Sequence, residues 1–220
     1  RSPRLNRSMY STTGGPTIAV VDTGVDASHP DLSGKVVAGA NCVNGSFVFG
    51  SRCRSGGSAD DNDHGTHVAG IAAAKTNNGV GVAGMAVNAL IQPVKVLNRN
   101  GSGSYADIAA GIDWAVANGA DVINMSLSGT SFSSTLCNAV SRAVADGVVV
   151  VAAAGNNADS SVVYPAGCSG AIGVSATTSS DTLASFSSYG SHVDVAAPGA
   201  SILSTVRGGY AVYSGTSMAA

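Results

Sequence analysis

Three residues of this chain, Asp22, His64 and Ser217, have the side chains needed for nucleophilic catalysis by a hydroxyl group. Such chemistry needs a hydroxyl nucleophile, a base that accepts its proton, an acid that orients the base, and hydrogen-bond donors for a developing oxyanion. Taken singly the three residues are weak evidence, because the chain contains 13 acidic residues and four histidines. The surrounding sequence decides whether they can act together.

Each of the three residues is expected at the end of a strand or near the start of a helix. Asp22 follows the short apolar, β-branched run TIAVV, which predicts a buried parallel strand over residues 17–21. His64 opens the Ala-rich sequence HGTHVAGIAAA, which predicts a helix that begins near the histidine. Ser217 follows Gly215, where the chain is predicted to turn toward another helix.

The elements between these residues alternate, which indicates an α/β fold. Helices are predicted over 104–118 and 134–146, the second with Leu136, Val140 and Val144 facing inward. Several predicted strands are apolar on both faces, so we expect a mainly parallel sheet covered by helices, with functional sites at the carboxyl ends of the strands. The further strands are predicted over residues 89–97, 121–127, 148–154, 171–175, 192–196 and 202–205.

Composition and charge narrow the class of protein. The 220 residues suit one domain with a single core, and no internal repeat or linker divides residues 1–220. The net charge of -2 and the charged fraction of 11% provide no basic surface for nucleic acid. No apolar run approaches the roughly 20 residues of a membrane span, and residues 1–16 lack the apolar stretch of a secretion signal. We therefore expect a soluble, already processed chain that binds neither nucleic acid nor membranes.

The four cysteines, Cys42, Cys53, Cys137 and Cys168, do not form the close sequence pairs that zinc sites usually require. Buried free thiols and two disulfides are both compatible with this spacing. We expect disulfides that join Cys42 to Cys53 and Cys137 to Cys168, since the first would close a short Gly/Ser-rich loop. Disulfides imply an oxidising compartment.

Five sequence motifs resemble the successive signatures of the subtilisin-like serine proteases (subtilases, peptidase family S8). They are VVDTGVDASHPDL, DNDHGTHVAGIAA, NMSLSG, VVAAAGN and SGTSMAA, in the family's order and at similar spacing over residues 17–220. The order Asp, His, Ser is that of subtilisin and differs from the orders in chymotrypsin and the α/β-hydrolases. The resemblance implies a three-layer α/β fold and a single catalytic domain. It also implies that the C-terminal part is missing just after the nucleophile motif, because the family's helix continues beyond Ala220.

The resemblance assigns a role to individual residues of these motifs. Ser217 would be the nucleophile, His64 the general base and then acid, and Asp22 the carboxylate that holds the imidazole tautomer. Asn156 matches the family's oxyanion asparagine, whose side-chain amide would act together with the Ser217 backbone N–H. The implied function is that of a secreted (extracellular) endopeptidase that hydrolyses peptide bonds through an acyl-enzyme. The alternative is a catalytically incompetent fragment or a non-catalytic binding form of the same family.

Two segments match the strands that line the family's primary specificity pocket and pair with an extended substrate. Their small side chains leave room for a large apolar group, and they contain no acid that would select Lys or Arg. We expect broad cleavage of proteins and peptides, with a preference for an aromatic or large apolar residue before the scissile bond. An inhibitory propeptide in the precursor and a monomeric enzyme are also expected. The wall residues are Ser126, Leu127, Ser128, Gly129, Ala153, Ala154 and Gly155.

Structural calcium is the one cofactor that the resemblance implies, and hard oxygen ligands suit Ca²⁺. One ligand set resembles the strong site of the thermitase branch: Asp31, the Asn78 side chain and the carbonyl groups of Lys75, Val80 and Val82. A second set resembles a site in proteinase K: Asp194 with the carbonyl groups of Ser169 and Ala171. The acidic residues before His64 form either another site or a solvated loop; they are Asp60, Asp61 and Asp63.

Other cofactor motifs match only in their letters. His64 and His67 share a helix face, but no third ligand accompanies them, so His67 is expected to be a packed, hydrogen-bonded residue. Residues 79–84 match GxGxxG, yet a helix is predicted before them and a strand after them, which is the reverse of a dinucleotide site. No organic cofactor is therefore expected. His29 and His192 have no chemical context, and surface or loop positions are expected for them.

Overall fold

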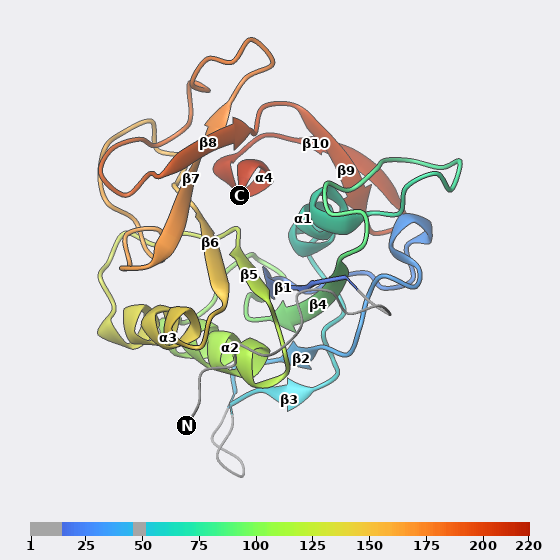
Figure 1. Cartoon of the computed structure of the whole chain (residues 1–220), viewed down its shortest axis with the longest axis horizontal. Coiled ribbons are helices and arrows are strands. Elements are labelled where there is room, and N and C mark those ends of the chain that lie inside the picture. The colour runs from blue at the N-terminus through green and yellow to red at the C-terminus, as the bar shows by residue number, and fades with distance from the viewer. Residues whose placement is uncertain (1–14, 46–51) are drawn as a thin grey trace.

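The computed structural model describes residues 15–45 and 52–220. Within these residues, eight strands form one sheet in the order β3-β2-β4-β1-β5-β6-β7-β8, and two form a separate antiparallel hairpin (Figure 1). Neighbours in the large sheet are parallel, except that β2 and β3 are antiparallel. The strands are β1 (Thr17–Asp22), β2 (Ala40–Asn41), β3 (Arg54–Ser55), β4 (Leu90–Lys95), β5 (Val122–Met125), β6 (Val149–Ala153), β7 (Ala171–Thr177), β8 (Val195–Pro198), β9 (Ile202–Val206) and β10 (Gly209–Tyr213).

Helices cover both faces of the large sheet, so the molecule has three layers. In Figure 1, α1 and α4 lie on one side of the sheet and α2 and α3 lie on the other. The hairpin of β9 and β10 packs against α1. The helices are the 3₁₀ turn η1 (Pro30–Leu32), α1 (His64–Ala73), α2 (Tyr105–Ala117), α3 (Ser134–Ala145) and α4 (Thr216–Ala219). The predicted α/β fold with a mainly parallel, helix-covered sheet is therefore confirmed.

Side-chain alternation along β1 supplies residues to two cores. Ala19 and Val21 belong to the core under α2 and α3, whereas Val20 belongs to the core under α1. Successive side chains of a strand point to opposite faces, so Asp22 lies on the same face as Val20. The strand therefore delivers the Asp22 carboxylate to the α1 side of the sheet.

The chain changes direction within the sheet at β1. β4, which follows α1 in the chain, pairs with β1 on one side, whereas β5 pairs with β1 on the other side. Open parallel sheets bind ligands outside the carboxyl ends of strands at such a reversal. The ends of β1, β5 and β6 meet there, and they place Asp22, Ser126 and Ala154 along one edge of the sheet.

The predicted inner face of α3 is wrong at one position. Val144 is 38% exposed, because the buried stripe consists of Leu136, Ala139, Val140 and Ala143, and Val144 lies at its edge. This stripe keeps the 3.6-residue period of a helix with alanines between the larger side chains. The small residues therefore let α3 approach the sheet, and Val144 packs over Gly170 instead.

Several element boundaries also differ from the prediction. The strand expected over 192–196 begins only at Val195, because His192 lies in a turn and Asp194 pairs with Gly173 of β7 outside the strand. The short strands β2, β3 and β10 were not predicted. The strands β2 and β3 have only two residues each, whereas β10 (GYAVY) has an apolar sequence but alternates exposed with half-buried positions instead of being buried on both faces.

Both expected disulfides are present. Cys42 is bonded to Cys53, and Cys137 is bonded to Cys168. The second joins α3 to the loop between β6 and β7.

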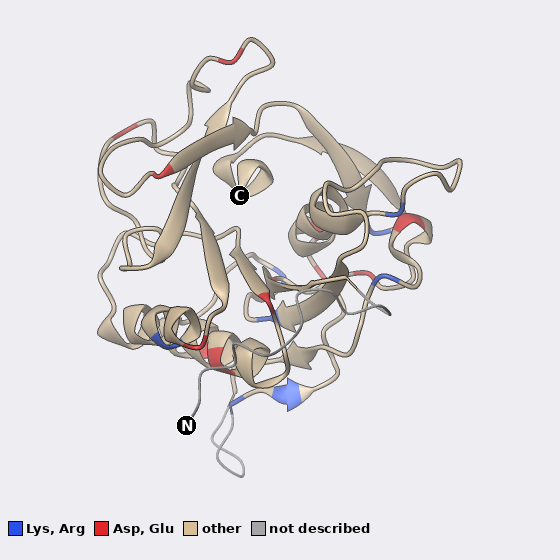
Figure 2. Cartoon of the chain, in the orientation of Figure 1, with Lys and Arg blue, Asp and Glu red and all other residues tan. Residues whose placement is uncertain are grey.

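Charged positions are distributed over loops, helices and strand ends in Figure 2. Across residues 15–45 and 52–220, no helix combines the length and the apolar character needed to cross a bilayer.

Candidate active site

Asp22 and His64 form the centre of the site. Asp22 is fully buried, and its two carboxylate oxygens lie 2.8 and 2.9 Å from His64 Nδ1. A carboxylate only accepts hydrogen bonds, so Nδ1 holds the proton and Nε2 is the basic nitrogen of the neutral imidazole. The backbone N–H of Thr23 donates to Asp22 Oδ1 at 2.6 Å, which fixes the carboxylate.

The first turn of α1 brings His64 close to the end of β1. Gly65 makes this approach possible, because any Cβ at that position would overlap the carbonyl oxygen of Gly24 and crowd Asp22. Before the helix, Asp63 has a left-handed φ of 90° and makes no side-chain cap. Its carboxylate instead forms an ion pair with Arg207, at 2.7 Å from Nε.

The surroundings of His64 favour its protonated form. Burial of the ring lowers its pKa, but the charge of Asp22, the hydrogen bond to Asp22 and the charge of Asp60 raise it. The net pKa lies above the ordinary value of 6.5. An imidazolium formed during proton transfer is therefore stabilised here.

Ser217 lies in the short helix α4, which packs against α1. Its hydroxyl donates to the carbonyl oxygen of Ser126 at 3.1 Å, and the Ser126 hydroxyl donates to the Ser217 carbonyl at 2.8 Å. Within the described residues, no hydrogen bond joins the Ser217 hydroxyl to His64. The structure thus pairs Asp22 with His64 and holds Ser217 against the end of β5.

The amide group of Asn156 is oriented by the residue before Ser217. Asn156 Oδ1 accepts hydrogen bonds from the backbone N–H of Thr216 at 2.8 Å and from its hydroxyl at 3.0 Å. The amide nitrogen must then point away from Thr216, and it lies near Gly215 on the exposed side of the loop. Two N–H groups of this amide are available as donors beside the α4 turn.

The two predicted wall segments lie next to each other, because they follow the neighbouring parallel strands β5 and β6. Gly129 exchanges two backbone hydrogen bonds of 2.8 Å with Tyr164, so the first segment is also held by the loop between β6 and β7. His192 Nε2 contacts the Ala154 carbonyl at 3.0 Å on the second segment. Ser128 is exposed, and Leu127 and Gly129 are half-buried. The other wall residues are buried: Ser126, Ala153, Ala154 and Gly155.

The other three histidines are buried and bind backbone carbonyl groups. The expectation for His67 is confirmed, since its Nε2 lies 3.2 Å from the Ile202 carbonyl and 3.1 Å from that of Ala211. Of the surface or loop positions expected for His29 and His192, the loop positions are confirmed, but the two side chains are 2% and 5% exposed and therefore not on the surface. His29 bonds to a carbonyl of β10, and its burial depends on a partner 180 residues away in the sequence.

Asp31 fits part of the first predicted calcium site. Its buried carboxylate accepts hydrogen bonds from Asn78 Nδ2 at 2.6 Å, the Val82 N–H at 2.9 Å and the Tyr210 hydroxyl at 3.0 Å. Burial raises the pKa of Asp31, but the three hydrogen-bond donors lower it by more. The net pKa lies below the ordinary value of a carboxyl group, so the carboxylate is ionised. Rotating the Asn78 amide would present an oxygen beside Asp31, and amide orientation is assigned from hydrogen bonding.

The remaining ligands of this set make other contacts. The Lys75 N–H donates to the Asp31 carbonyl at 2.8 Å, and the Val80 N–H donates to Asn78 Oδ1 at 3.2 Å. Val82 offers its N–H rather than its carbonyl oxygen to Asp31. The Asp31 carboxylate therefore suits a hard cation, whereas Asn78 and Val82 are placed as hydrogen-bond donors to it, and Asn78 Oδ1 would have to give up the Val80 N–H to become a ligand.

The second calcium set is less well assembled. Asp194 is exposed and accepts the Gly173 N–H at 2.9 Å, while no hydrogen bond links it to Ser169 or Ala171 in the described chain. No group of three His, Cys or Asp side chains among the described residues is arranged to hold a metal.

Among the described residues, the acidic side chains before His64 are not grouped to hold a metal, and of the three only Asp61 is exposed to solvent. Asp60 is buried with five hydrogen bonds, Asp61 pairs with Lys95, and Asp63 pairs with Arg207. A short acidic sequence does not show which carboxylates point inward, so sequence reasoning missed the role of Asp60. Asp60 directly precedes the motif DNDHGTHVAGIAA, which begins at Asp61, so no motif marked it.

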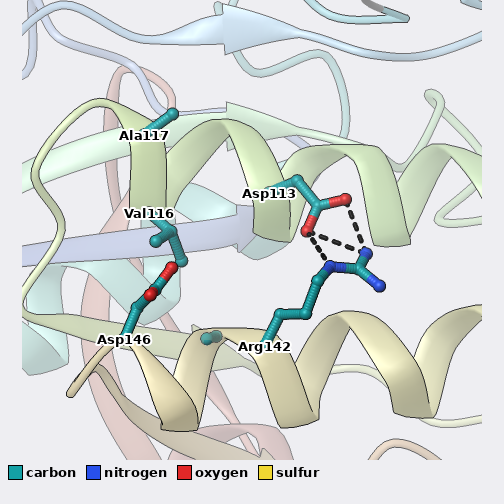
Figure 3. A pocket seen from close by; sticks show the side chains of 6 residues that line it. Asp113, Val116, Ala117, Arg142 and Asp146 are labelled. Atoms are coloured by element: carbon teal, nitrogen blue, oxygen red, sulfur yellow. Dashed lines mark hydrogen bonds and ion pairs between the residues drawn. The ribbon is translucent and has the colours of Figure 1, made fainter. Parts of the chain in front are cut away.

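A pocket elsewhere on the molecule contains none of the predicted site residues. It lies between α2 and α3, where the Arg142 guanidinium crosses to the Asp113 carboxylate (Figure 3). Both residues are about half exposed, so this ion pair is a surface contact. The other lining residues are Val116, Ala117, Ala143 and Asp146.

Comparisons with known proteins agree with this geometry. A sequence profile of the subtilase family (peptidase S8) matches residues 13–220. The thermophilic serine proteinase of Bacillus sp. (strain AK1) is 52% identical over 206 residues, which cover 93% of this chain and 49% of that protein. Thermitase of Thermoactinomyces vulgaris is 51% identical, with 93% of this chain and 71% of that protein covered. The solved structure of proteases from Pseudoalteromonas arctica PAMC 21717 has a TM-score of 0.86 and 40% identity, covering 94% of this chain and 74% of that chain.

A shared fold alone would not establish a relationship, because common folds host unrelated functions. Here the profile match extends over nearly the whole chain, and relatives above 50% identity contain the same segments. The chain belongs to the subtilase family.

Proposed function

We propose that this chain provides the catalytic centre of a secreted serine endopeptidase, with Ser217 as nucleophile, His64 as base and then acid, and Asp22 as orienting carboxylate. The observation that supports it best is the buried Asp22 carboxylate on His64 Nδ1, at 2.8 and 2.9 Å, which leaves Nε2 as the base. Catalytic serines need a base whose tautomer is held in this way. Membership of the subtilase family supports the same reaction class.

The reaction begins when the Ser217 hydroxyl leaves the Ser126 carbonyl and turns to His64. Ser217 Oγ attacks the carbonyl carbon of the peptide, and its proton passes to His64 Nε2. His64 then gives that proton to the departing amine nitrogen as the C–N bond breaks, which leaves an acyl-enzyme ester on Ser217. Water, deprotonated by His64, hydrolyses the ester and restores the serine.

The tetrahedral oxyanion is stabilised by Asn156 Nδ2 and by the backbone N–H of Ser217. Thr216 holds Asn156 Oδ1 at 2.8 and 3.0 Å and thereby directs the amide nitrogen outward. In subtilisin, loss of the corresponding donor costs about 100- to 1,000-fold in kcat. We expect a loss of this order for Asn156→Ala with KM little changed, and an unaltered kcat would exclude the role.

The substrate lies between the two wall segments. Main-chain pairing along residues 126–129 does not depend on the substrate sequence, and the small residues 153–155 leave space for a large apolar group. Aromatic or large aliphatic residues are therefore preferred before the scissile bond. Peptides that differ only at that position test this preference, and a tenfold advantage for Lys or Arg would contradict it.

A structural Ca²⁺ would be held by Asp31 and Asn78, and it would neutralise a buried carboxylate beside the loop 75–82. Thermal unfolding with and without a chelator measures this contribution. A lower unfolding temperature in the presence of chelator supports a bound Ca²⁺, and an identical temperature excludes it.

The enzyme acts as a monomer on protein substrates and is made with an inhibitory propeptide.

Labelling with a fluorophosphonate tests the central assignment. Uptake at Ser217, lost in Ser217→Ala and in a heat-denatured sample, supports the catalytic serine. The competing function is a non-catalytic binding form of the family, and absence of label in folded protein would favour it.

A further inference from the structure

Asp60 lies in the loop before α1, and its side chain is almost completely inside the protein, with 7% of the residue exposed. Two backbone N–H groups of its own loop donate to Oδ1, from Asn62 at 2.9 Å and Asp63 at 3.1 Å. The Thr23 hydroxyl donates to the same oxygen at 2.9 Å. Oδ2 accepts the Thr66 N–H at 3.0 Å and the Thr66 hydroxyl at 2.5 Å.

These bonds join the two elements that contain the His–Asp pair. Thr23 directly follows Asp22 at the end of β1, and its N–H donates to Asp22 Oδ1. Thr66 lies in the first turn of α1, two residues after His64. The Thr23 hydroxyl also accepts the Gly65 N–H at 3.0 Å. The side chains of Asp60 and Thr23 therefore link the end of β1 to the first turn of α1.

Asp60 differs from its acidic neighbours in having no cationic partner. Asp61 forms an ion pair with Lys95 and Asp63 with Arg207, whereas no ion pair of Asp60 occurs in the described part of the chain. A buried carboxylate without a counter-ion is costly unless hydrogen bonds stabilise it. Neutral side chains could satisfy several of the same N–H groups, so the charge itself calls for an explanation.

We propose that Asp60 is a positioning residue for the pair of His64 and Asp22. Its carboxylate fixes the end of β1 and the start of α1 relative to each other. Its negative charge also stabilises the imidazolium that forms when His64 accepts the Ser217 proton. The inference rests on the proposed function and extends it to a residue that does not touch the substrate.

The charge effect acts among several other groups near His64. The titratable groups on the elements around it are Asp22 at the end of β1, Asp60, Asp61 and Asp63 in the preceding loop, His67 on α1, Lys95 on β4, Arg207 between β9 and β10, and Tyr213 on β10, whose ring stacks on that of His67. Lys95 and Arg207 are each paired with a different aspartate. The charges that raise the pKa of His64 are those of Asp22 and Asp60.

The first test compares Asp60→Asn with the unchanged full-length protein in peptide hydrolysis over a range of pH. The asparagine side chain has nearly the same shape as that of aspartate, but it has no charge. Its NH₂ group would face N–H and O–H groups that now donate to the Asp60 carboxylate. We expect kcat to fall by about 10- to 100-fold with KM unchanged, as a displaced catalytic group causes. The acid limb of the pH profile should move to lower pH, since an anion that favours imidazolium is gone.

The matched control is Asp61→Asn, which removes a charge from the adjacent position. The Asp61 side chain is 50% exposed and is paired with Lys95, so water and the ammonium screen it from His64. A much smaller change in kcat and in the acid limb is expected. Equal effects of Asp60→Asn and Asp61→Asn, or an unchanged kcat in Asp60→Asn, would overturn the inference.

A second pair of variants separates geometry from charge and also decides the case if Asp60→Asn does not fold. Thr23→Val removes the hydroxyl between Asp60 and Gly65 but keeps the carboxylate, whereas Thr23→Ser keeps the hydroxyl. We expect kcat to fall in Thr23→Val without a shift of the acid limb, and Thr23→Ser to recover most of it. Equal kcat values in these two variants would contradict the positioning role.

Failure of the proposed function gives a different result. In that case the unchanged protein neither hydrolyses peptides nor takes up a fluorophosphonate at Ser217. If the unchanged protein is active and labelled while Asp60→Asn behaves identically, only the role of Asp60 is excluded.

Discussion

His64 is a base whose protonated form is favoured by its neighbours. Hydrolysis requires neutral imidazole in the free enzyme, so kcat/KM falls as pH decreases through the His64 pKa. Because burial lowers that pKa but Asp22 and Asp60 raise it overall, the acid limb is expected above pH 6.5. A pH profile with a substrate that does not titrate measures it. A midpoint at or below 6.5 would show that burial outweighs the two carboxylates.

Thr216 has a distinct role at the same scale, because it fixes Asn156 without touching the substrate. Thr216→Val removes the hydroxyl that donates to Asn156 Oδ1 at 3.0 Å and accepts the Gly155 N–H at 3.2 Å, but it keeps the shape of the side chain and the backbone donor to Asn156. We expect kcat to fall by about 2- to 10-fold, the equivalent of one hydrogen bond, with KM unchanged. Thr216→Ser retains the hydroxyl and serves as the control in the same steady-state assay. A rise in KM with constant kcat would assign the residue to substrate binding instead.

At the scale of elements, the distance between α1 and β1 determines whether the His–Asp pair forms. Gly65 is the point of closest approach, since the neighbouring Gly24 carbonyl occupies the space of a side chain. The hairpin of β9 and β10 holds α1 from the other side through the His67 ring and through hydroxyl groups of Ser204 and Thr205. The helix α1 is therefore held between the large sheet and the hairpin of β9 and β10.

Gly65→Ala should displace the first turn of α1. The methyl group conflicts with backbone atoms that cannot rotate away, so we expect kcat to fall by about 100-fold and the free energy of unfolding by about 1–3 kcal/mol. Gly209→Ala is the control, because no atom lies within 4 Å of a Cβ at Gly209. Steady-state kinetics and urea unfolding measure both effects. Activity close to that of the control would show that α1 can shift without separating His64 from Asp22.

For the whole molecule, one disulfide links the ends of the paired strands β2 and β3, and the other links α3 to the loop between β6 and β7. The bond between Cys42 and Cys53 spans 11 residues, and the bond between Cys137 and Cys168 spans 31. A longer closed loop loses more entropy in the unfolded chain when it is cross-linked. The second disulfide also holds the end of the loop that contains Tyr164, the backbone partner of Gly129.

Removing the disulfide that closes the longer loop should therefore be the more destabilising change. We expect the double variant Cys137→Ala/Cys168→Ala to lose about 4 kcal/mol and Cys42→Ala/Cys53→Ala about 3 kcal/mol. Urea unfolding of the two variants and the parent protein, all without reductant, gives the comparison. A larger loss from the shorter loop would show that native-state packing, and not loop entropy, dominates.

Local patterns in the sequence were sufficient for the central elements and the reacting groups. The apolar run before Asp22, the Ala-rich run after His64 and the spacing of the five motifs predicted the parallel sheet, its helices and the family. The cysteine spacing led to both disulfides. These features were predictable because strand and helix periodicity and short motifs depend on residues close together in the chain.

Tertiary structure alone decided which polar residues are buried and what they contact. In the sequence Asp60 is one of three equivalent acids, and His29 and His192 are expected in surface or loop positions. Their burial follows from partners that lie 37, 180 and 38 residues away in the chain. The same reason accounts for the role of Thr216, whose hydroxyl meets Asn156 60 residues earlier in the chain. The sequence by itself determined the fold class and the family, and it predicted the residues of the site. Folding decided how the site is supported, because a hydrogen bond depends on two groups meeting in space and the pattern around either one does not specify the other.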